Sequence, residues 1–171
     1  MAGPQASVLV RAPLSAVQRS DIQFLIARRS ERREEDAFWI DDRPFVMRIG
    51  EQIDGELEET IAEGLPDVLG WSPRDLVHLG AAGDEAIDHV LLGGLCLQLA
   101  KDLNGLVDFG GTILSLDHLP PPVRVECPNG LAGCLYVTEY VGAGAVRSFT
   151  QYGDAEFLES WLNAATYRLV K

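Results

Sequence analysis

Apolar positions recur along the chain with two spacings, one typical of strands and one typical of helices. Short runs rich in β-branched and aromatic residues, bounded by Gly, Pro or Asp, predict strands. These strands are expected at residues 7–11, 38–40, 45–49, 75–79, 105–109, 135–141 and 146–152. Longer segments whose apolar residues return every three or four positions predict helices at residues 15–29, 53–65, 85–103 and after Asp154.

The order of these elements indicates the fold class. A strand, a helix and two strands come first, followed by helices and strands in turn and a final hairpin and helix. This order favours an α+β fold, with helices packed on a mixed, mostly antiparallel sheet and a ferredoxin-like β-α-β-β start. A chain of 171 residues has the usual length of one domain, so residues 1–171 are expected to form a single unit.

Two of the predicted helices make specific expectations about burial. In the first, Val17, Phe24 and Leu25 are expected among the buried residues. The helix at 85–103 is apolar on nearly all sides in its first turns, which predicts that it is central or covered by a partner. Its Gly93-Gly94 pair lowers helix propensity, so a neighbouring group is expected to approach closely there.

The formal net charge of −12 excludes several classes of partner. Proteins that follow nucleic-acid phosphates or anionic membranes need clustered positive charge, so neither partner is expected. The charge is also unevenly distributed. Residues 1–48 carry eight arginines and seven acids, a net of +1, whereas residues 49–171 carry six basic and nineteen acidic residues, a net of −13.

An acidic segment follows the balanced N-terminal part. No Lys or Arg occurs between Arg48 and Arg74. This segment and the Trp that follows it form the predicted partner-binding surface, because negative charge accelerates association with a basic protein and aromatic residues anchor interfaces. The residues expected to contact a protein partner are Asp54, Glu56, Glu59, Glu63 and Trp71.

The sequence also indicates a compartment. The N-terminus lacks the basic region of a signal peptide, and the longest apolar run is far shorter than a membrane span. Three cysteines without a dense framework are typical of a reducing cytosol, so a cytoplasmic protein is expected. Cys127 and Cys134 flank a Pro-Asn-Gly turn and could face each other, which leaves a disulfide or two free thiols open.

A few polar residues in apolar surroundings are candidates for catalysis. Asp88 and His89 lie in the apolar helix, and Asp108 and Glu139 lie in apolar strands, so together they could form an acid–base site. The other interpretation is structural, with each group held by hydrogen bonds inside the fold. The three histidines lack metal-ligand spacing, and no phosphate-binding or nucleophile motif occurs, so no metal or cofactor is predicted.

Several short motifs resemble small bacterial families of unknown function. They are Gly70-Trp71-Ser72-Pro73, Asp88-His89, Leu99-Ala100 and the segment from Gly105 to Gly111. Some relatives in this broad set resemble immunity proteins of polymorphic toxin systems. The resemblance implies an intracellular α+β protein that works by binding another protein. No catalytic residue is established for such families, so none is transferred here.

Three functions remain as hypotheses. The first is a cytosolic protein-binding module of the immunity or antitoxin type, which inhibits a basic toxin. The second is an enzyme whose acid–base site is built from Asp88, His89, Asp108 and Glu139. The third is a self-assembling scaffold subunit with an apolar interface near Gly93-Gly94. The acidic segment and the lack of an assembled catalytic motif favour binding over catalysis, and the oligomeric state is left open.

Overall fold

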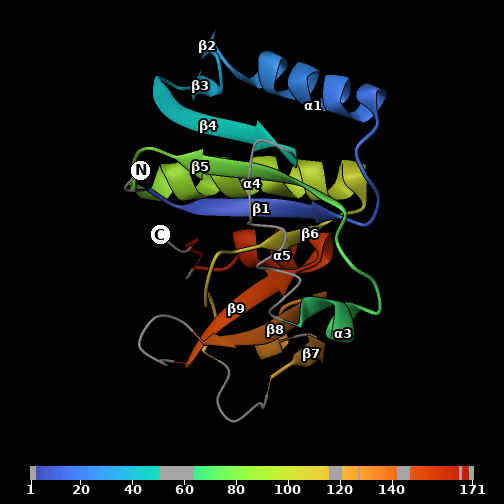
Figure 1. Cartoon of the computed structure of the whole chain (residues 1–171). Coiled ribbons are helices and arrows are strands. Elements are labelled where there is room, and N and C mark those ends of the chain that lie inside the picture. Colours follow the sequence, from blue (N-terminus) through green and yellow to red (C-terminus); the bar gives the residue numbers. More distant parts are fainter. Residues whose placement is uncertain are drawn as a thin grey trace.

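The computed structural model describes residues 3–50, 64–115, 121–126, 128–141, 147–165 and 167–169 (Figure 1). This part of the chain has the α+β fold expected from the sequence. Its helices are α1 (Ala16–Arg29), α3 (Leu65–Leu69), α4 (Ala86–Leu103) and α5 (Ala155–Leu162). Its strands are β1 (Gln5–Val10), β2 (Arg32–Glu34), β3 (Ala37–Ile40), β4 (Arg43–Ile49), β5 (Asp75–Ala81), β6 (Leu106–Asp108), β7 (Val123–Glu126), β8 (Cys134–Val141) and β9 (Arg147–Gly153).

The nine described strands form one sheet in the order β2-β3-β4-β5-β1-β6-β9-β8-β7. Every neighbouring pair is antiparallel, so the sheet is not mixed. Its centre is ferredoxin-like, because β1-α1-β4 and β5-α4-β6 are two crossovers that each straddle an antiparallel strand. The hairpin β2-β3 extends one edge of this centre, and β9-β8-β7 extend the other.

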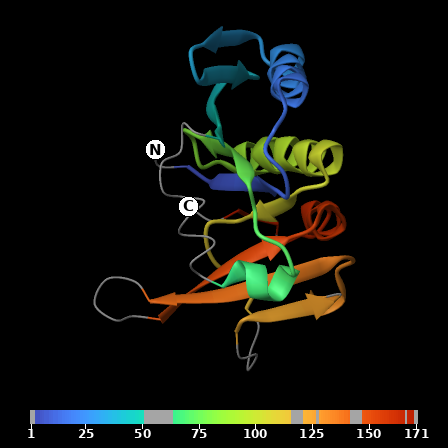
Figure 2. The ribbon, with the colours of Figure 1, turned by 45° about the vertical axis from the view of Figure 1, so that its right-hand side comes forward.

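Three of the described helices lie on one face of the sheet. Figure 2 shows α1, α4 and α5 stacked along this face. Alternate strand residues such as Val8, Val77 and Val107 point to it and join the main core. The intervening residues point to the opposite face, where α3 places Leu65 against Leu9 and the other members of a smaller cluster, Leu76, Leu106 and Tyr152.

Local sequence signals explain most of the boundaries. Ser15 caps α1 by accepting a hydrogen bond from the backbone N–H of Gln18. Asp154 caps α5 in the same way. Asn104 ends α4 in the left-handed conformation. None of the described helices combines the length and the apolar composition needed to cross a bilayer.

The observed elements differ from the predicted ones in three places. The helix expected at residues 53–65 lies mostly outside the described residues, and α3 begins at Leu65 rather than ending there, because Pro66 is tolerated in a first helical turn. Strand β2 occupies a segment expected to be a helix end and loop, since its three exposed, charged residues have no apolar alternation. Strand β7 was not predicted either.

Burial along α1 differs from the prediction. Ile22 and Ile26 form its buried side, and Leu25 is half-buried. Val17 and Phe24 are 69% and 63% exposed, so the expectation that they are buried was wrong. At 100° per residue, both lie on the side of the helix away from Ile22 and Ile26. A helix at the periphery of the helical layer buries only one narrow face, which leaves the other apolar stripe in solvent.

Candidate functional site

Asp88 lies in the first turn of α4 and is 1% exposed. One of its carboxylate oxygens accepts a hydrogen bond from Arg43 Nη1 at 2.9 Å, and the other accepts one from the backbone N–H of Glu85 at 2.8 Å. Arg43 also donates to the exposed carboxylate of Glu85 at 2.6 Å. Asp88 therefore closes the first turn of α4 and ties it to β4.

His89 is equally buried and uses both ring nitrogens. Its Nδ1 accepts a hydrogen bond from the backbone N–H of Leu169 at 3.0 Å, which places the ring proton on Nε2, 3.1 Å from an oxygen of Asp84. Its backbone carbonyl accepts a hydrogen bond from the Tyr167 hydroxyl at 2.8 Å. These contacts fasten the C-terminal segment to α4, and they leave neither ring nitrogen directed at solvent.

Asp108 and Glu139 do not come together. Asp108 is opposite Tyr152, which is opposite Tyr136, so these three side chains share the face away from α4. Glu139 is three residues beyond Tyr136 and points to the other face. Strand β9 also separates β6 from β8. The four candidate catalytic residues thus occupy two sides of the sheet, and the only adjacent pair among them is Asp88 and His89.

A serine–histidine contact that sequence analysis missed lies on the face away from α4. Ser7 Oγ of β1 is 3.1 Å from His78 Nδ1 of β5, which is within the range of nucleophile–base pairs. Asp108 is opposite Ser7 on the other side, but one of its oxygens accepts a hydrogen bond from the backbone N–H of Gly110. Ser7 is only 3% exposed. Only the register of β1 and β5 brings these residues together, so spacing in the sequence gives no sign of them.

The described cysteines differ in environment. Cys96 is fully buried in α4, and burial raises the pKa of its thiol to about 12, so it carries no thiolate near neutral pH. Cys134 is half-buried, with Arg124 Nη2 at 3.1 Å from its sulfur. Cys127, the predicted partner for Cys134, lies outside the described residues. No three His, Cys, Asp or Glu side chains in the described part of the chain are arranged to hold a metal ion.

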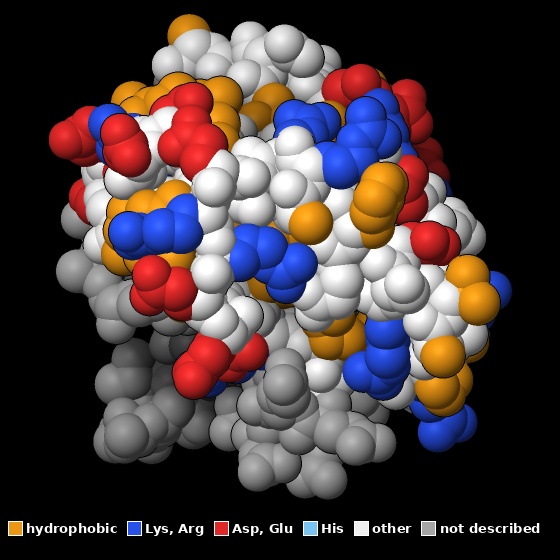
Figure 3. Space-filling model, turned by 90° about the horizontal axis from the view of Figure 1, so that it is seen from above, with side chains coloured by type: hydrophobic (Ala, Val, Ile, Leu, Met, Phe, Trp, Pro, Cys, Tyr) orange, Lys and Arg blue, Asp and Glu red, His pale blue; other side chains and the backbone are white. Residues whose placement is uncertain are grey.

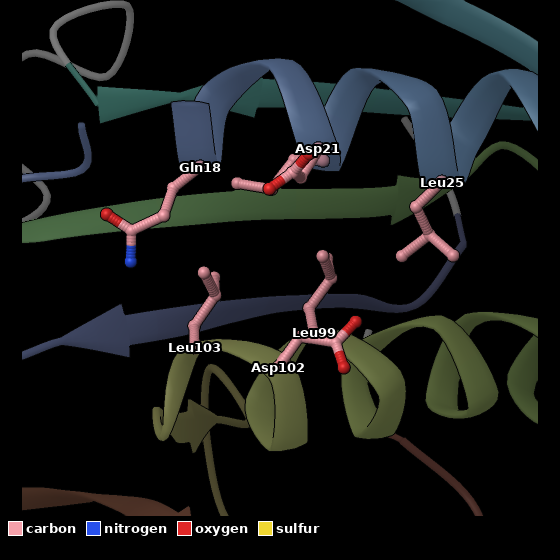
Figure 4. A pocket seen from close by; sticks show the side chains of 7 residues that line it. Gln18, Asp21, Leu25, Leu99, Asp102 and Leu103 are labelled. Atoms are coloured by element: carbon pink, nitrogen blue, oxygen red, sulfur yellow. The ribbon is translucent and has the colours of Figure 1, made fainter. Parts of the chain in front are cut away.

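A groove runs between α1 and α4. Figure 4 shows Leu25 of α1 and Leu99 and Leu103 of α4 lining it, with the carboxylates of Asp21 and Asp102 at its rim. A second, wider hollow of about 360 Å³ shares Asp21 and Leu25 with it. Its other lining residues are Phe24, Arg28, Arg29 and Gln98. The two hollows adjoin at Asp21 and Leu25, beside the exposed stripe of α1.

The predicted partner-binding acids Asp54, Glu56, Glu59 and Glu63 lie outside the described residues. Both ends of their segment are described, at β4 and at α3. Asp67 is exposed on α3. Trp71 follows, half-buried beside the smaller cluster, and the guanidinium of Arg11 lies 5.1 Å from the centre of its ring. Trp71 thus packs on the face of the sheet opposite α1, α4 and α5.

The model of one family of unknown function, DUF6368, matches residues 2–171. The chain belongs to the DUF6368 family. The match covers nearly the whole chain, so the central sheet and its flanking helices all lie within the matched residues. No curated protein and no solved structure matches the chain significantly.

Because DUF6368 is a family of unknown function, it supplies no residue role for this member. The geometry of the described residues is therefore the evidence that bears on function. That geometry gives Asp88 and His89 structural partners inside the fold. It leaves Val17 and Phe24 exposed on α1 and Trp71 half-buried beside α3.

Proposed function

We propose that this DUF6368 protein is an intracellular protein-binding module of the immunity or antitoxin type, and that its partner is a basic toxin. The observation that carries the proposal is the position of Trp71. This half-buried ring lies beside α3, in the described part of the segment that contains no Lys or Arg. The proposed partner-binding surface is the sheet face that carries α3. The acids Asp54, Glu56, Glu59 and Glu63, which lie outside the described residues, are proposed to contribute the negative charge.

The charge distribution supports a basic partner. Residues 49–171 carry a net charge of −13, and seven acids but no basic residue lie between Arg48 and Arg74. Charges of one sign on a surface steer an oppositely charged protein and raise its association rate by one or more orders of magnitude at low salt. Trp71 offers an apolar ring to a partner, and rings of this kind carry much of the binding energy at interfaces.

An enzyme receives less support from the same structure. An acid–base site needs at least two groups that converge on one accessible place. Asp88 and His89 are each 1% exposed and are hydrogen-bonded to other parts of the fold. Asp108 and Glu139 are on opposite faces of the sheet. A binding protein needs no such convergence.

Capture from a lysate of the native host tests the proposal. The tagged protein is expected to retain one abundant basic protein at low salt, and its Trp71→Ala variant is expected to retain at least tenfold less. The Glu56→Lys/Glu59→Lys variant should slow association at least tenfold in a surface-binding assay with the recovered partner, and high salt should remove this difference.

A matched variant controls for net charge. Asp102→Lys/Glu156→Lys changes the charge by the same amount at exposed positions on α4 and α5, on the other face of the sheet. It is expected to associate nearly as fast as the unmodified protein. Recovery of no protein at low salt would overturn the proposal, and so would an equal loss in both charge variants.

A further inference from the structure

The exposed stripe of α1 has the spacing of a helix-packing seam. Val17, Asp21, Phe24 and Arg28 follow one another at intervals of four, three and four residues, and all four are exposed. At 100° per residue they fall within about 60° of the helix circumference. The stripe therefore places one acid, one aromatic ring and one base in a line on the outside of the molecule.

The polar members of this stripe have no ion-pair partner within the described residues. Arg28 lies over the Phe24 ring, with 5.8 Å between its guanidinium carbon and the ring centre. Both groups also line the hollow of about 360 Å³, together with Asp21 and Leu25. Viewed from the α1 end of the molecule, Figure 3 shows basic and acidic side chains interspersed with hydrophobic ones.

This arrangement is self-complementary. Along the sequence, the midpoint between Asp21 and Arg28 lies at position 24.5, half a residue beyond Phe24. If a second α1 lies antiparallel across this midpoint, residue i faces residue 49 − i, so each Asp21 faces an Arg28 and the two Phe24 rings meet near the two-fold axis. A two-fold interface requires this pattern, in which each surface supplies both members of every contact.

We propose that this face of α1 is a self-association surface that binds a second copy of the chain. The two α1 helices pack antiparallel, the two Phe24 rings meet beside the hollows, and two Asp21–Arg28 ion pairs flank the rings. The inference does not rest on the proposed toxin partner, which binds the opposite face of the sheet.

The pairing of Asp21 with Arg28 favours a second copy as the occupant, because one face of α1 supplies both the acid and the base. Between Ala16 and Arg29 the chain carries three arginines and one acid, a net of +2 in a molecule of −12. Arg19 pairs with Asp75 of its own chain and Arg28 meets Asp21 of the other copy, so one arginine per copy is left uncompensated at the contact, and the net charge of −12 still opposes association. A single pair of short helices buries less than the roughly 1,200 Å² of standard interfaces, so the association is expected at micromolar concentrations rather than below.

Charge-reversal variants at Asp21 and Arg28 test the antiparallel pairing of the two α1 helices. Their dimerisation is measured by sedimentation velocity, from about 5 to 500 μM protein at about 150 mM NaCl. Asp21→Arg places Arg opposite Arg, and Arg28→Asp places Asp opposite Asp, so each variant alone should dimerise at least tenfold more weakly than the unmodified protein. An equimolar mixture of the two variants restores both opposite-charge contacts and should form a heterodimer of nearly the original affinity.

Apolar truncations supply the matched control. Phe24→Ser should weaken the dimer at least tenfold, whereas Val90→Ser, at an exposed valine of α4, should leave it unchanged. Circular dichroism confirms that each variant remains folded. A monomer at every concentration overturns the proposal. It is also overturned if Val90→Ser alone abolishes association, or if the mixture of charge variants stays monomeric. None of these outcomes alters the capture of a basic partner through Trp71.

Discussion

At the scale of single residues, the contacts of Asp88 make a direct prediction about stability. Replacing Asp88 with Ala removes the partner of Arg43 Nη1 and leaves the backbone N–H of Glu85 without its acceptor. Hydrogen bonds that involve a buried charge contribute about 1.5–3 kcal/mol each, and Arg43 keeps some access to solvent. We expect the free energy of unfolding to fall by about 2–4 kcal/mol, measured by urea denaturation.

Glu85→Gln is the matched control, because it changes the other carboxylate that Arg43 contacts. Glu85 is exposed, and surface ion pairs contribute less than about 1 kcal/mol. An equal loss in both variants would contradict a structural role for Asp88 that depends on its burial. The sequence indicated a buried acid at this position, but not its partner. Arg43 lies 45 residues away and meets Asp88 only when β4 is placed beside β5.

At the scale of elements, the two adjacent glycines of α4 are expected to respond in opposite directions. A Cβ at Gly93 would overlap the Tyr167 hydroxyl, whereas a Cβ at Gly94 would meet nothing within 4 Å. Gly93→Ala should therefore destabilise the protein. Gly94→Ala should stabilise it by about 0.5–1 kcal/mol, because alanine loses less conformational entropy in a helix. Thermal unfolding of the two variants measures both effects, and stabilisation by Gly93→Ala would contradict the observed packing.

The close approach expected at Gly93-Gly94 is thus confirmed for Gly93 alone, and the approaching group comes from the C-terminal segment. Some helix ends were predictable, because capping is a local property of residues such as Asp154 and Asn104. Strand β2 was not predictable, because a charged edge strand is stabilised by its pairing with β3 and not by an apolar pattern. The exposure of Phe24 was also missed, since a periodic pattern does not tell which apolar stripe of a helix faces the core.

At the scale of the whole molecule, the pairing of distant strands decided which candidate residues meet. The α+β class and the ferredoxin-like start followed from the order of the elements. The register of β1 with β5 and β6, which places Ser7 between His78 and Asp108, did not follow from that order. Pairing between strands about 70 residues apart leaves no periodic signal in either strand. The net charge of −12, in contrast, is fixed by the sequence and acts on every encounter between copies.

That charge predicts how salt affects association through α1. Two compact chains of this length in contact have centres about 40 Å apart. Charges of −12 at this separation repel by about 15 kcal/mol in water before screening. The Debye length is about 30 Å at 10 mM salt and about 8 Å at 150 mM, so screening reduces the repulsion to about 4 kcal/mol and then to about 0.1 kcal/mol.

The two Asp21–Arg28 pairs contribute only about 1–2 kcal/mol in total, because exposed ion pairs are weak. The loss of long-range repulsion therefore outweighs the screening of these pairs. We expect the dimerisation constant to rise at least tenfold between 10 and 150 mM NaCl, measured by sedimentation equilibrium, while sucrose at matched osmolality leaves it unchanged. A constant that falls with added salt would mean that local ion pairs dominate the association, and it would contradict a dimer in which the acidic parts of two copies still repel each other.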